Sequence, residues 1–195
     1  MNASKPQQGI QLQTGETALV GYGSLLSLPS LERTLGRTYT GPFLQCMIRG
    51  WRRTWDAAMP NQKFYTEGAE GRMTPEAILY LNVRKDPSTN LNGVVFVVNQ
   101  EELAAYDRRE SIYDRADVTA DLDVKVTGGT AYMYVCRPEY VMTGVKSPAK
   151  AAVRASYLRI VENGLSNLDE DFRRRYLDSS DAPPAHLVVD DRNLD

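Results

Sequence analysis

An apolar run that stops at a glycine-rich turn and then opens a short helix most constrains what this chain can fold into. Residues 17–26 read TALVGYGSLL, with three apolar residues in a row before the first glycine. Such a run is typical of a strand buried on both faces. Gly21 and Gly23 form the turn, and a short leucine-bearing helix is expected to continue as far as Gly36. Strand, turn and helix together either cradle an anion on backbone N–H groups or present a nucleophile.

Two familiar versions of this layout do not fit the turn. A dinucleotide-binding G-x-G-x-x-G loop needs a third glycine, where this chain has Leu26. A nucleophile elbow, G-x-S-x-G, needs glycines at the positions of Tyr22 and Leu26. Ser24 also has no histidine to activate it except His186, near the C-terminus. The turn is therefore either an anion cradle or a plain strand-to-helix connection.

The composition is that of an ordinary globular protein. Of the 195 residues 42% are hydrophobic and 25% are charged, and the net charge of −2 gives no field for nucleic acid or anionic membranes. No apolar stretch approaches the length of a membrane span, and the first 16 residues have no secretory character. Cys46, Cys136 and the single His186 make neither a disulfide framework nor a zinc site. We expect a cytoplasmic protein without nucleic-acid or membrane partners, either a monomer or a homodimer.

The order of predicted elements indicates one domain. We expect a mobile N-terminal tail over 1–16, a single domain over 17–180 and a C-terminal tail over 181–195. Strands dominate the middle of the chain, and helices do not alternate with them regularly. The expected strands are 43–59, 77–83, 91–98, 112–126 and 130–136, with a turn at 86–90; the expected helices are 99–110, 147–164 and 168–177. This order predicts an α+β fold with a mixed, barrel-like β-sheet flanked by helices.

A second stretch, YDRRESIYDR at residues 106–115, carries the other candidate site residue. A short stretch with so many Asp, Glu and Arg residues usually marks an exposed helix end. Glu110, however, lies at the expected helix-to-strand junction, next to Ile112 and Tyr113, which are expected to point inward. A carboxyl group at that place would be partly desolvated and its pKa would rise, which suits a proton shuttle.

Taken together, the two stretches resemble the γ-glutamylcyclotransferase superfamily. The shared features are Gly-Tyr-Gly-Ser-Leu after the first strand and an Asp-x-x-Glu-x-x-Tyr element after a later strand–helix unit. The resemblance implies that the catalytic acid/base is Glu110. It also implies that the γ-glutamyl group is held by Gly21, Tyr22, Gly23, Ser24, Leu25, Tyr113 and, more loosely, Tyr157.

The implied reaction needs no metal, cofactor or protein nucleophile. The α-amino group of a small γ-glutamyl substrate attacks its own γ-carbonyl, which releases 5-oxoproline and a free amine or peptide. Backbone N–H groups of residues 22–25 would bind the carboxylate or the developing oxyanion. Ser24 would donate a hydrogen bond, while Tyr22 and Tyr113 would wall the pocket or donate into it.

Departures from the family pattern leave the substrate open. The family often has Leu-Asp where this chain has Tyr106-Asp107, and a glycine soon after the glutamate, where this chain has Ser111 and Ile112. The alternative is therefore an inactive member of the fold that binds a small ligand. The leaving amine could belong to glutathione, a γ-glutamyl dipeptide, a γ-glutamylamine or another metabolite. Two features, Tyr22-Gly23-Ser24-Leu25 and Arg109-Glu110, favour the glutathione-specific, ChaC-type branch slightly. A polar loop at 60–76 is a candidate lid.

Overall fold

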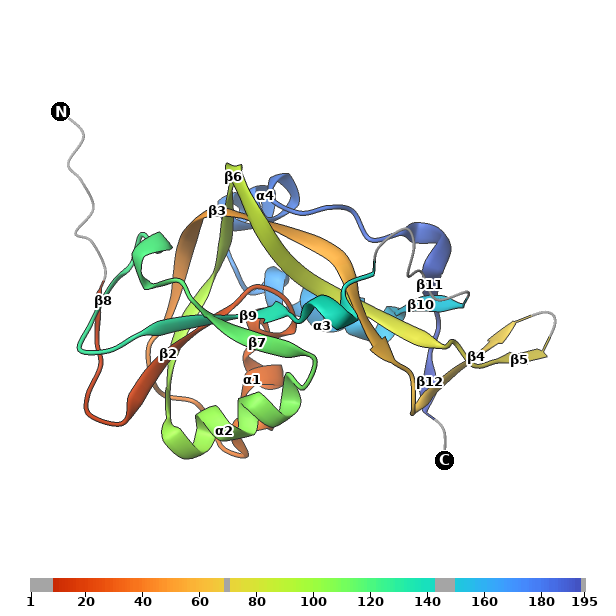
Figure 1. Ribbon diagram of the computed structural model, residues 1–195, viewed down its shortest axis with the longest axis horizontal. Helices are drawn as coiled ribbons and strands as arrows, with labels where there is room; N and C mark the ends of the chain where they lie inside the picture. Colours follow the sequence, from red (N-terminus) through yellow and green to blue (C-terminus); the bar gives the residue numbers. More distant parts are fainter. Residues whose placement is uncertain (1–8, 69–70, 143–149, 194–195) are drawn as a thin grey trace.

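A computed structural model of the chain describes residues 9–68, 71–142 and 150–193. A central sheet is covered by helices, and a small hairpin projects from one end of the molecule (Figure 1). The strands are β1 (Gly9–Gln11), β2 (Glu16–Gly21), β3 (Phe43–Pro60), β4 (Phe64–Gly68), β5 (Gly71–Met73), β6 (Ala77–Asn99), β7 (Tyr113–Asp117), β8 (Lys125–Thr127), β9 (Ala131–Cys136), β10 (Ala151–Arg154), β11 (Val188–Val189) and β12 (Arg192–Asn193). The helices are α1 (Leu28–Leu35), α2 (Gln100–Arg109), α3 (Ala155–Ser166) and α4 (Glu170–Asp178), with short 3₁₀ turns η1 (Ser24–Leu26), η2 (Thr119–Asp121), η3 (Pro138–Tyr140) and η4 (Ala185–Leu187).

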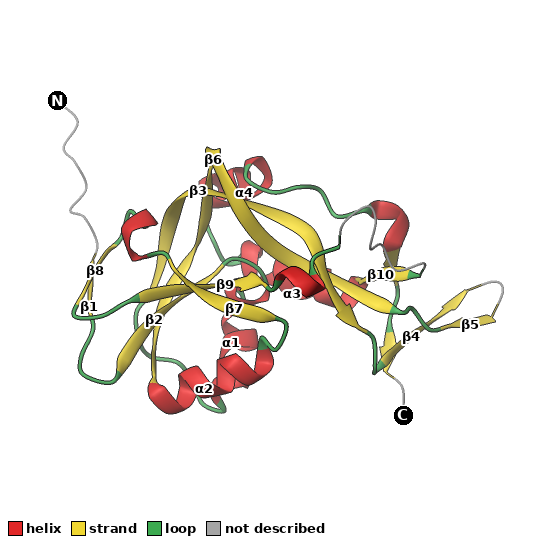
Figure 2. Ribbon diagram, in the orientation of Figure 1, coloured by secondary structure: helices red, strands yellow, loops and turns green. Residues whose placement is uncertain are grey.

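The central sheet is mixed, as predicted. Its strand order is β11-β10-β6-β2-β9-β7, with β3 paired to β6. β2 runs antiparallel to β6 but parallel to β9, and β10 runs parallel to both of its neighbours. Isolated bridges from Ile48 to Leu122 and from Ala57 to Val141 join β3 to segments that follow β7 and β9, so the sheet curls strongly. The predicted α+β class with helices flanking a mixed sheet is confirmed (Figure 2).

The middle of β2, residues 18–20, is apolar because both faces of the strand are covered there. Side chains alternate between the two faces of a strand, so Leu19 points toward α1 and α2 while Ala18 and Val20 point toward α3 and α4. The α1–α2 side buries Leu25, Leu31, Tyr39, Phe96, Val98, Leu103, Tyr106 and Tyr134 together with Leu19. The opposite side includes Val161 of α3 and Phe172 and Tyr176 of α4. The turn after β2 therefore emerges between two packed layers.

Residues 77–99 form one long strand rather than two. The prediction of separate strands joined by a turn was wrong, because β3 supplies backbone partners along nearly the whole length of β6. The turn chemistry is nevertheless present at residues 86–89, which bulge out of the ladder opposite Gly50. There the Asp86 carboxylate accepts hydrogen bonds from Ser88 and from the hydroxyl of Thr89.

The helix that leads to Glu110 begins as predicted. The Asn99 side chain accepts from the Glu102 N–H at 2.9 Å, and the Glu102 carboxylate accepts from the Asn99 N–H at 3.0 Å, which is a complete capping box. α2 ends with Glu110 as its C-cap, whose N–H donates to the Tyr106 carbonyl. The cap therefore sets the point along the chain at which the carboxylate leaves the helix.

The start and the end of α3 differ from the prediction. The expected start at Ser147-Pro148 lies outside the described residues, while Ala151–Arg154 forms a strand because its backbone pairs with β6 and β11. Gly164, expected to stop the helix, lies within it. A Cβ atom on Gly164 would come within 2.8 Å of the backbone of Leu26 and Ser27. The glycine is therefore needed for close packing of α3 on η1.

Parts of both expected tails are paired with the rest of the chain. β1, within the expected N-terminal tail, runs parallel to β8. β11 and β12, within the expected C-terminal tail, pair with β10 and β4. Within the expected polar loop 60–76, Phe64–Gly68 and Gly71–Met73 pair as the antiparallel strands β4 and β5. Within the described residues, no helix combines the length and apolarity that a membrane crossing requires.

Candidate active site

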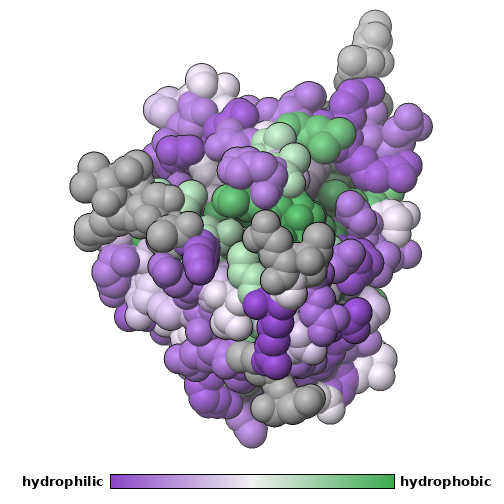
Figure 3. Space-filling model, turned by 90° about the vertical axis from the view of Figure 1, so that its right-hand side faces the viewer, coloured by the Kyte–Doolittle hydropathy of each residue, from purple (hydrophilic) through white to green (hydrophobic). Residues whose placement is uncertain are grey.

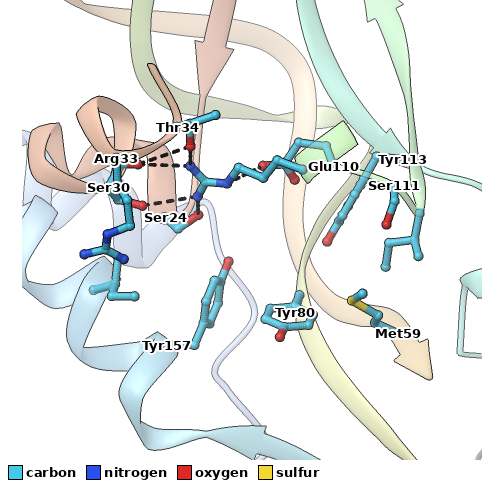
Figure 4. Close-up of a pocket in the computed structure, with 13 residues that line it drawn as sticks. Ser24, Ser30, Arg33, Thr34, Met59, Tyr80, Glu110, Ser111, Tyr113 and Tyr157 are labelled. Atoms are coloured by element: carbon cyan, nitrogen blue, oxygen red, sulfur yellow. Dashed lines mark hydrogen bonds and ion pairs between the residues drawn. The ribbon is translucent and has the colours of Figure 1, made fainter. Parts of the chain in front are cut away.

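The turn after β2 opens onto a cavity of about 340 Å³. The cavity lies where η1, α1, the end of α2 and the start of β7 meet α3 and the facing ends of β3 and β6 (Figure 4). It is lined by Ser24, Ser30, Arg33, Thr34, Met59, Tyr80, Arg109, Glu110, Ser111, Ile112, Tyr113, Tyr157 and Ile160. The two stretches that the sequence singled out thus share one cavity.

A narrower recess of about 30 Å³ adjoins this cavity beneath the turn. Tyr22, Gly23, Ser24 and Leu25 line the recess together with Glu110. The turn's own hydrogen bonds use the N–H groups of the two residues that follow Leu25, which donate to the carbonyls of Gly23 and Ser24. The first N–H groups of a helical turn have no partner within the turn. The residues of the turn and the Glu110 carboxyl group thus line the same recess.

Glu110 stands where the cavity and the recess meet. Its side chain is only 17% exposed. Burial raises the pKa of Glu110 above its ordinary value, and the neighbouring Arg109 guanidinium acts in the opposite direction. A carboxyl group with a raised pKa that faces a cavity can both accept and return a proton near neutral pH. The sequence-based expectation of a desolvated carboxyl group at this junction is confirmed.

Arg109 connects Glu110 to the turn and to α1. Its Nε lies 3.2 Å from the Glu110 carboxylate, and its Nη2 donates to the Ser24 hydroxyl at 2.8 Å. It also donates to the carbonyl and hydroxyl of Ser30 and to the Thr34 hydroxyl. One planar guanidinium thus fixes the carboxylate and the Ser24 side chain relative to each other. Ser24, expected to donate a hydrogen bond, accepts one here.

Three tyrosines wall the site and have their hydroxyl groups anchored or packed. Tyr22 donates to the Tyr134 carbonyl at 2.8 Å, and Tyr113 donates to the Leu81 carbonyl at 2.9 Å. Both therefore shape the pocket rather than donating into it. The Tyr157 ring is edge-on to Tyr80, with the ring centroids 4.9 Å apart. Its hydroxyl lies against Gly23, where a Cβ atom would come within 3.0 Å of it.

The structure brings most of the predicted site residues together. Glu110, Tyr113, Tyr157 and the turn residues Tyr22 to Leu25 line the cavity or the recess. Gly21 lines neither of them. It is the last residue of β2, and a Cβ atom there would approach the Leu25 side chain to 2.7 Å, so a glycine is needed for the close turn. The candidate lid at 60–76 contributes no described residue to either lining.

Sequence reasoning assigned no role in the site to Arg33, Ser30, Thr34 or Arg53, and it noted Arg109 only as the neighbour of Glu110. A serine and a threonine four residues apart on one helix, as Ser30 and Thr34 are, would have been the available signal for a polar helix face. Arg53 lies on the inner side of the turn. It is fully buried, and its Nε donates to the Tyr22 carbonyl at 2.8 Å.

No cluster that could hold a metal ion is found in the described ranges: nowhere there do three or more His, Cys, Asp or Glu side chains gather suitably. Both cysteines are free and buried. Burial raises the pKa of the Cys136 thiol to about 12, so this thiol is protonated at neutral pH.

Comparisons with known proteins connect this geometry with one fold. No family model and no curated protein matches the sequence. A solved structure named γ-glutamyl cyclotransferase aligns with a TM-score of 0.54 at 14% identity, over 87% of this chain and 90% of that one. A yeast γ-glutamyl cyclotransferase specific to glutathione aligns with a TM-score of 0.50 at 14% identity, over 84% of this chain and 95% of that one. A human protein described as uncharacterized aligns with a TM-score of 0.53 at 14% identity, over 84% and 87%.

The fold is therefore that of the γ-glutamylcyclotransferase-like proteins, and the resemblance predicted from two short motifs is confirmed at this level. At such low identity the alignment establishes the fold alone, because one fold hosts several functions. What the chain does has to be argued from its own cavity.

Proposed function

We propose that this chain is a γ-glutamyl cyclotransferase that needs no cofactor. One observation carries the proposal. Glu110, with its raised pKa, stands between a recess framed by the backbone of a glycine turn and a cavity large enough for a small substrate. It is the one carboxylate in the lining of that cavity, as far as the described residues go.

The residues support an intramolecular acyl transfer. Glu110 accepts a proton from the substrate's α-amino group, whose nitrogen then attacks the γ-carbonyl carbon and forms the new C–N bond of a five-membered ring. The tetrahedral intermediate collapses as the original amide C–N bond breaks. Glu110 returns the proton to the departing amine, so the carboxylate is regenerated and the products are 5-oxoproline and a free amine. No residue of the protein has to become acylated.

The turn supplies the remaining requirement, which is a fixed conformation of the substrate. Backbone N–H groups of Gly23 to Leu25 would hold the α-carboxylate or the oxyanion of the tetrahedral intermediate. Holding the curled substrate makes ring closure effectively unimolecular, which can contribute about 7 kcal/mol or more toward lowering the barrier. Arg109 holds the Glu110 carboxylate and the Ser24 hydroxyl at a fixed position relative to each other during both proton transfers.

The alternative is a binding protein that has the fold but not the chemistry. The observation that favours it is the chain directly after the carboxylate, where Ser111 and Ile112 stand instead of a glycine. Ile112 is 5% exposed and lines the cavity, so its side chain narrows the space next to Glu110. A γ-glutamyl compound that binds without being turned over would favour this alternative.

The deciding experiment measures 5-oxoproline release from glutathione, γ-glutamyl dipeptides and γ-glutamylamines by the wild type and by Glu110→Gln. We expect the isosteric variant to lose about 10³-fold in kcat/KM, within the range for general acid–base groups. Glu101→Gln, which changes an exposed carboxylate on the same helix, is the matched control and should keep full activity. Equal turnover by wild type and Glu110→Gln would contradict the role of Glu110. A cytoplasmic location and a monomeric or dimeric state stay predictions from the sequence.

A further inference from the structure

The cavity has two chemically different walls. The wall formed by η1, α1 and the end of α2 is polar and carries Ser24, Ser30, Thr34, Arg109 and Glu110. The apolar wall carries Met59 from β3, Tyr80 from β6 and Ile112 from the approach to β7, which belong to one apolar cluster. Ile160 from α3 also lines the cavity. Figure 4 shows Met59 and Tyr80 on the side of the cavity away from Ser30 and Thr34. The reaction described above uses only the polar wall.

The apolar wall belongs to the end of the sheet that carries the hairpin. β4 and β5 connect the ends of β3 and β6 that bear Met59 and Tyr80. Seen from this end, hydrophobic residues gather at the centre of the face, surrounded by hydrophilic ones (Figure 3). Met59 and Tyr80 are each partly exposed, so their side chains are available to a ligand. A ligand group that covered this wall would gain from removing apolar surface from water.

One charge in the lining is not balanced. Arg109 and Glu110 pair with each other at 3.2 Å. Arg33, on α1, is exposed, and its guanidinium forms neither a hydrogen bond nor an ion pair with any residue that the structure describes. A guanidinium at the edge of a cavity is well suited to a carboxylate, which it can bind with two parallel hydrogen bonds.

We propose that the cavity selects γ-glutamyl compounds whose leaving amine is an apolar amino acid. Its side chain would lie against Met59, Tyr80, Ile112 and Ile160, and its carboxylate would pair with Arg33. This inference rests on the proposed cyclotransferase reaction, since the γ-glutamyl part has to occupy the turn side near Glu110. A leaving group with a charged side chain is disfavoured, because the apolar wall offers little hydrogen bonding to replace its lost hydration.

The test compares three substrates that differ only in the leaving amine: γ-glutamyl-leucine, γ-glutamyl-glycine and γ-glutamyl-isopentylamide, which keeps the alkyl group but lacks the carboxylate. We expect kcat/KM for the leucine compound to exceed that for the glycine compound by about tenfold or more, as for alkyl groups in other apolar pockets. It should also exceed that for the isopentylamide.

Variants separate the two contacts. Arg33→Gln should lower kcat/KM for γ-glutamyl-leucine by about tenfold, as loss of a charge-assisted hydrogen bond would, and leave that for the isopentylamide unchanged. Ile160→Ser should reduce the preference for leucine over glycine. Arg159→Gln is the matched control, since Arg159 is exposed on α3 outside the cavity lining. Equal effects of Arg33→Gln on both leucine and isopentylamide substrates would overturn the carboxylate contact.

The outcomes distinguish this inference from the proposed function. Turnover with equal kcat/KM for the leucine and glycine compounds would overturn the apolar subsite and leave the cyclotransferase standing. If no compound is turned over, the cyclotransferase fails, and calorimetry of the same three compounds with the wild-type protein decides the subsite. Tighter binding of γ-glutamyl-leucine than of γ-glutamyl-glycine would then support the subsite, and equal or absent binding would overturn it.

Discussion

Two arginines hold the turn after β2 from opposite sides, and their surroundings differ. Arg53 lies behind the turn, fully buried, and donates to the Tyr22 carbonyl, to Asn92 and to Ser179. Arg109 lies in front of the turn, where its 26% exposed side chain faces the cavity and pairs with Glu110. Arg53 donates to neutral oxygen atoms, whereas Arg109 pairs with a carboxylate in addition to neutral oxygen atoms.

The difference shows how one cation can support a backbone while another serves a reacting group. Burial lowers the pKa of Arg53 to about 10, so it remains charged at neutral pH, and its guanidinium carbon lies 3.9 Å from the ring centroid of Tyr176. The hydrogen bonds of Arg53 go to neutral oxygen atoms of Tyr22, Asn92 and Ser179, so it supports the turn rather than a reacting carboxylate. Arg109 touches Glu110 directly and therefore influences the pKa on which proton transfer depends.

The largest effect is expected from removing the buried arginine. Arg53→Met leaves the Tyr22 carbonyl and the Asn92 and Ser179 side chains without their donor, and each buried polar group left unpaired costs about 1–3 kcal/mol. The free energy of unfolding, measured in urea, should fall by about 3 kcal/mol or more.

Arg52→Met is the control for this change. Arg52 is the neighbour of Arg53 on β3, is 31% exposed at its side chain and pairs with Asp181. Its removal should cost about 1 kcal/mol or less. Similar losses for the two variants would show that Arg53 behaves as an ordinary surface arginine.

The second effect concerns activity rather than stability. Arg109→Gln removes the guanidinium that contacts both the Glu110 carboxylate and the Ser24 hydroxyl. A reacting group that is misplaced as a result can cost about a hundredfold in kcat/KM. Removing the guanidinium also raises the pKa of Glu110 further, because Arg109 opposes the effect of burial.

Glu110 must be ionised to accept the first proton, so the acidic limb of the kcat/KM profile should move to higher pH in Arg109→Gln. The other groups that face Glu110, Tyr22, Tyr113 and Tyr157, have pKa values raised by burial and stay neutral. Arg108→Gln, on the exposed side of the same helix end, should leave the profile in place. An acidic limb that does not move would argue against electrostatic coupling between Arg109 and Glu110.

Packing of α3 against η1 is expected to hold the turn in place, as the two arginines do. In Gly164→Ala the new methyl group meets the backbone of Leu26 and Ser27 at 2.8 Å. Overpacking of this kind costs about 1–3 kcal/mol, and the better helix propensity of alanine returns only about 1 kcal/mol.

We therefore expect a net loss of stability together with a higher KM, measured by urea unfolding and by steady-state kinetics. Asn163→Ala, at the exposed neighbouring position on α3, should be neutral or slightly stabilising. A Gly164→Ala variant that is more stable than the wild type would mean that η1 moves freely away from α3.

The smallest effect is expected at the start of α3, just before Tyr157. The Asp191 carboxylate, 5% exposed, accepts from the N–H and hydroxyl of Ser156 and from Arg154. Burial by itself would raise the pKa of Asp191, but these hydrogen bonds outweigh it, so the pKa lies below its ordinary value.

A depressed pKa contributes stability above the unfolded value, about pH 4, and that contribution is lost as the pH falls through the lower folded value. Asp191→Asn should therefore cost about 1 kcal/mol at pH 7 and flatten the acid side of the stability curve. Asp190→Asn, at a 95% exposed side chain, is the control. If Asp191→Asn leaves the acid side of the stability curve unchanged, protonation of Asp191 is not coupled to folding.

Local signals in the sequence predicted several elements well. The glycine turn after a buried strand, the capping box at Asn99 and Glu102, and the position of Glu110 at the end of that helix depend on neighbours within a few residues. Predictions failed where distant pairing decided the outcome. β6 is continuous because its backbone pairs with β3, and Ala151–Arg154 is a strand because its backbone pairs with β6 and β11.

The sequence by itself determined the two halves of the site, a turn near Ser24 and a desolvated carboxyl group at Glu110, because both arise from short-range patterns of glycine, apolar residues and helix caps. Only the tertiary structure decided that these halves meet. The hydrogen bond between Arg109 and Ser24 joins residues 85 positions apart. Arg53 and the apolar wall likewise depend on how the sheet curls and on which face α3 packs. Such contacts follow from strand pairing and burial over the whole chain, and no local pattern encodes them.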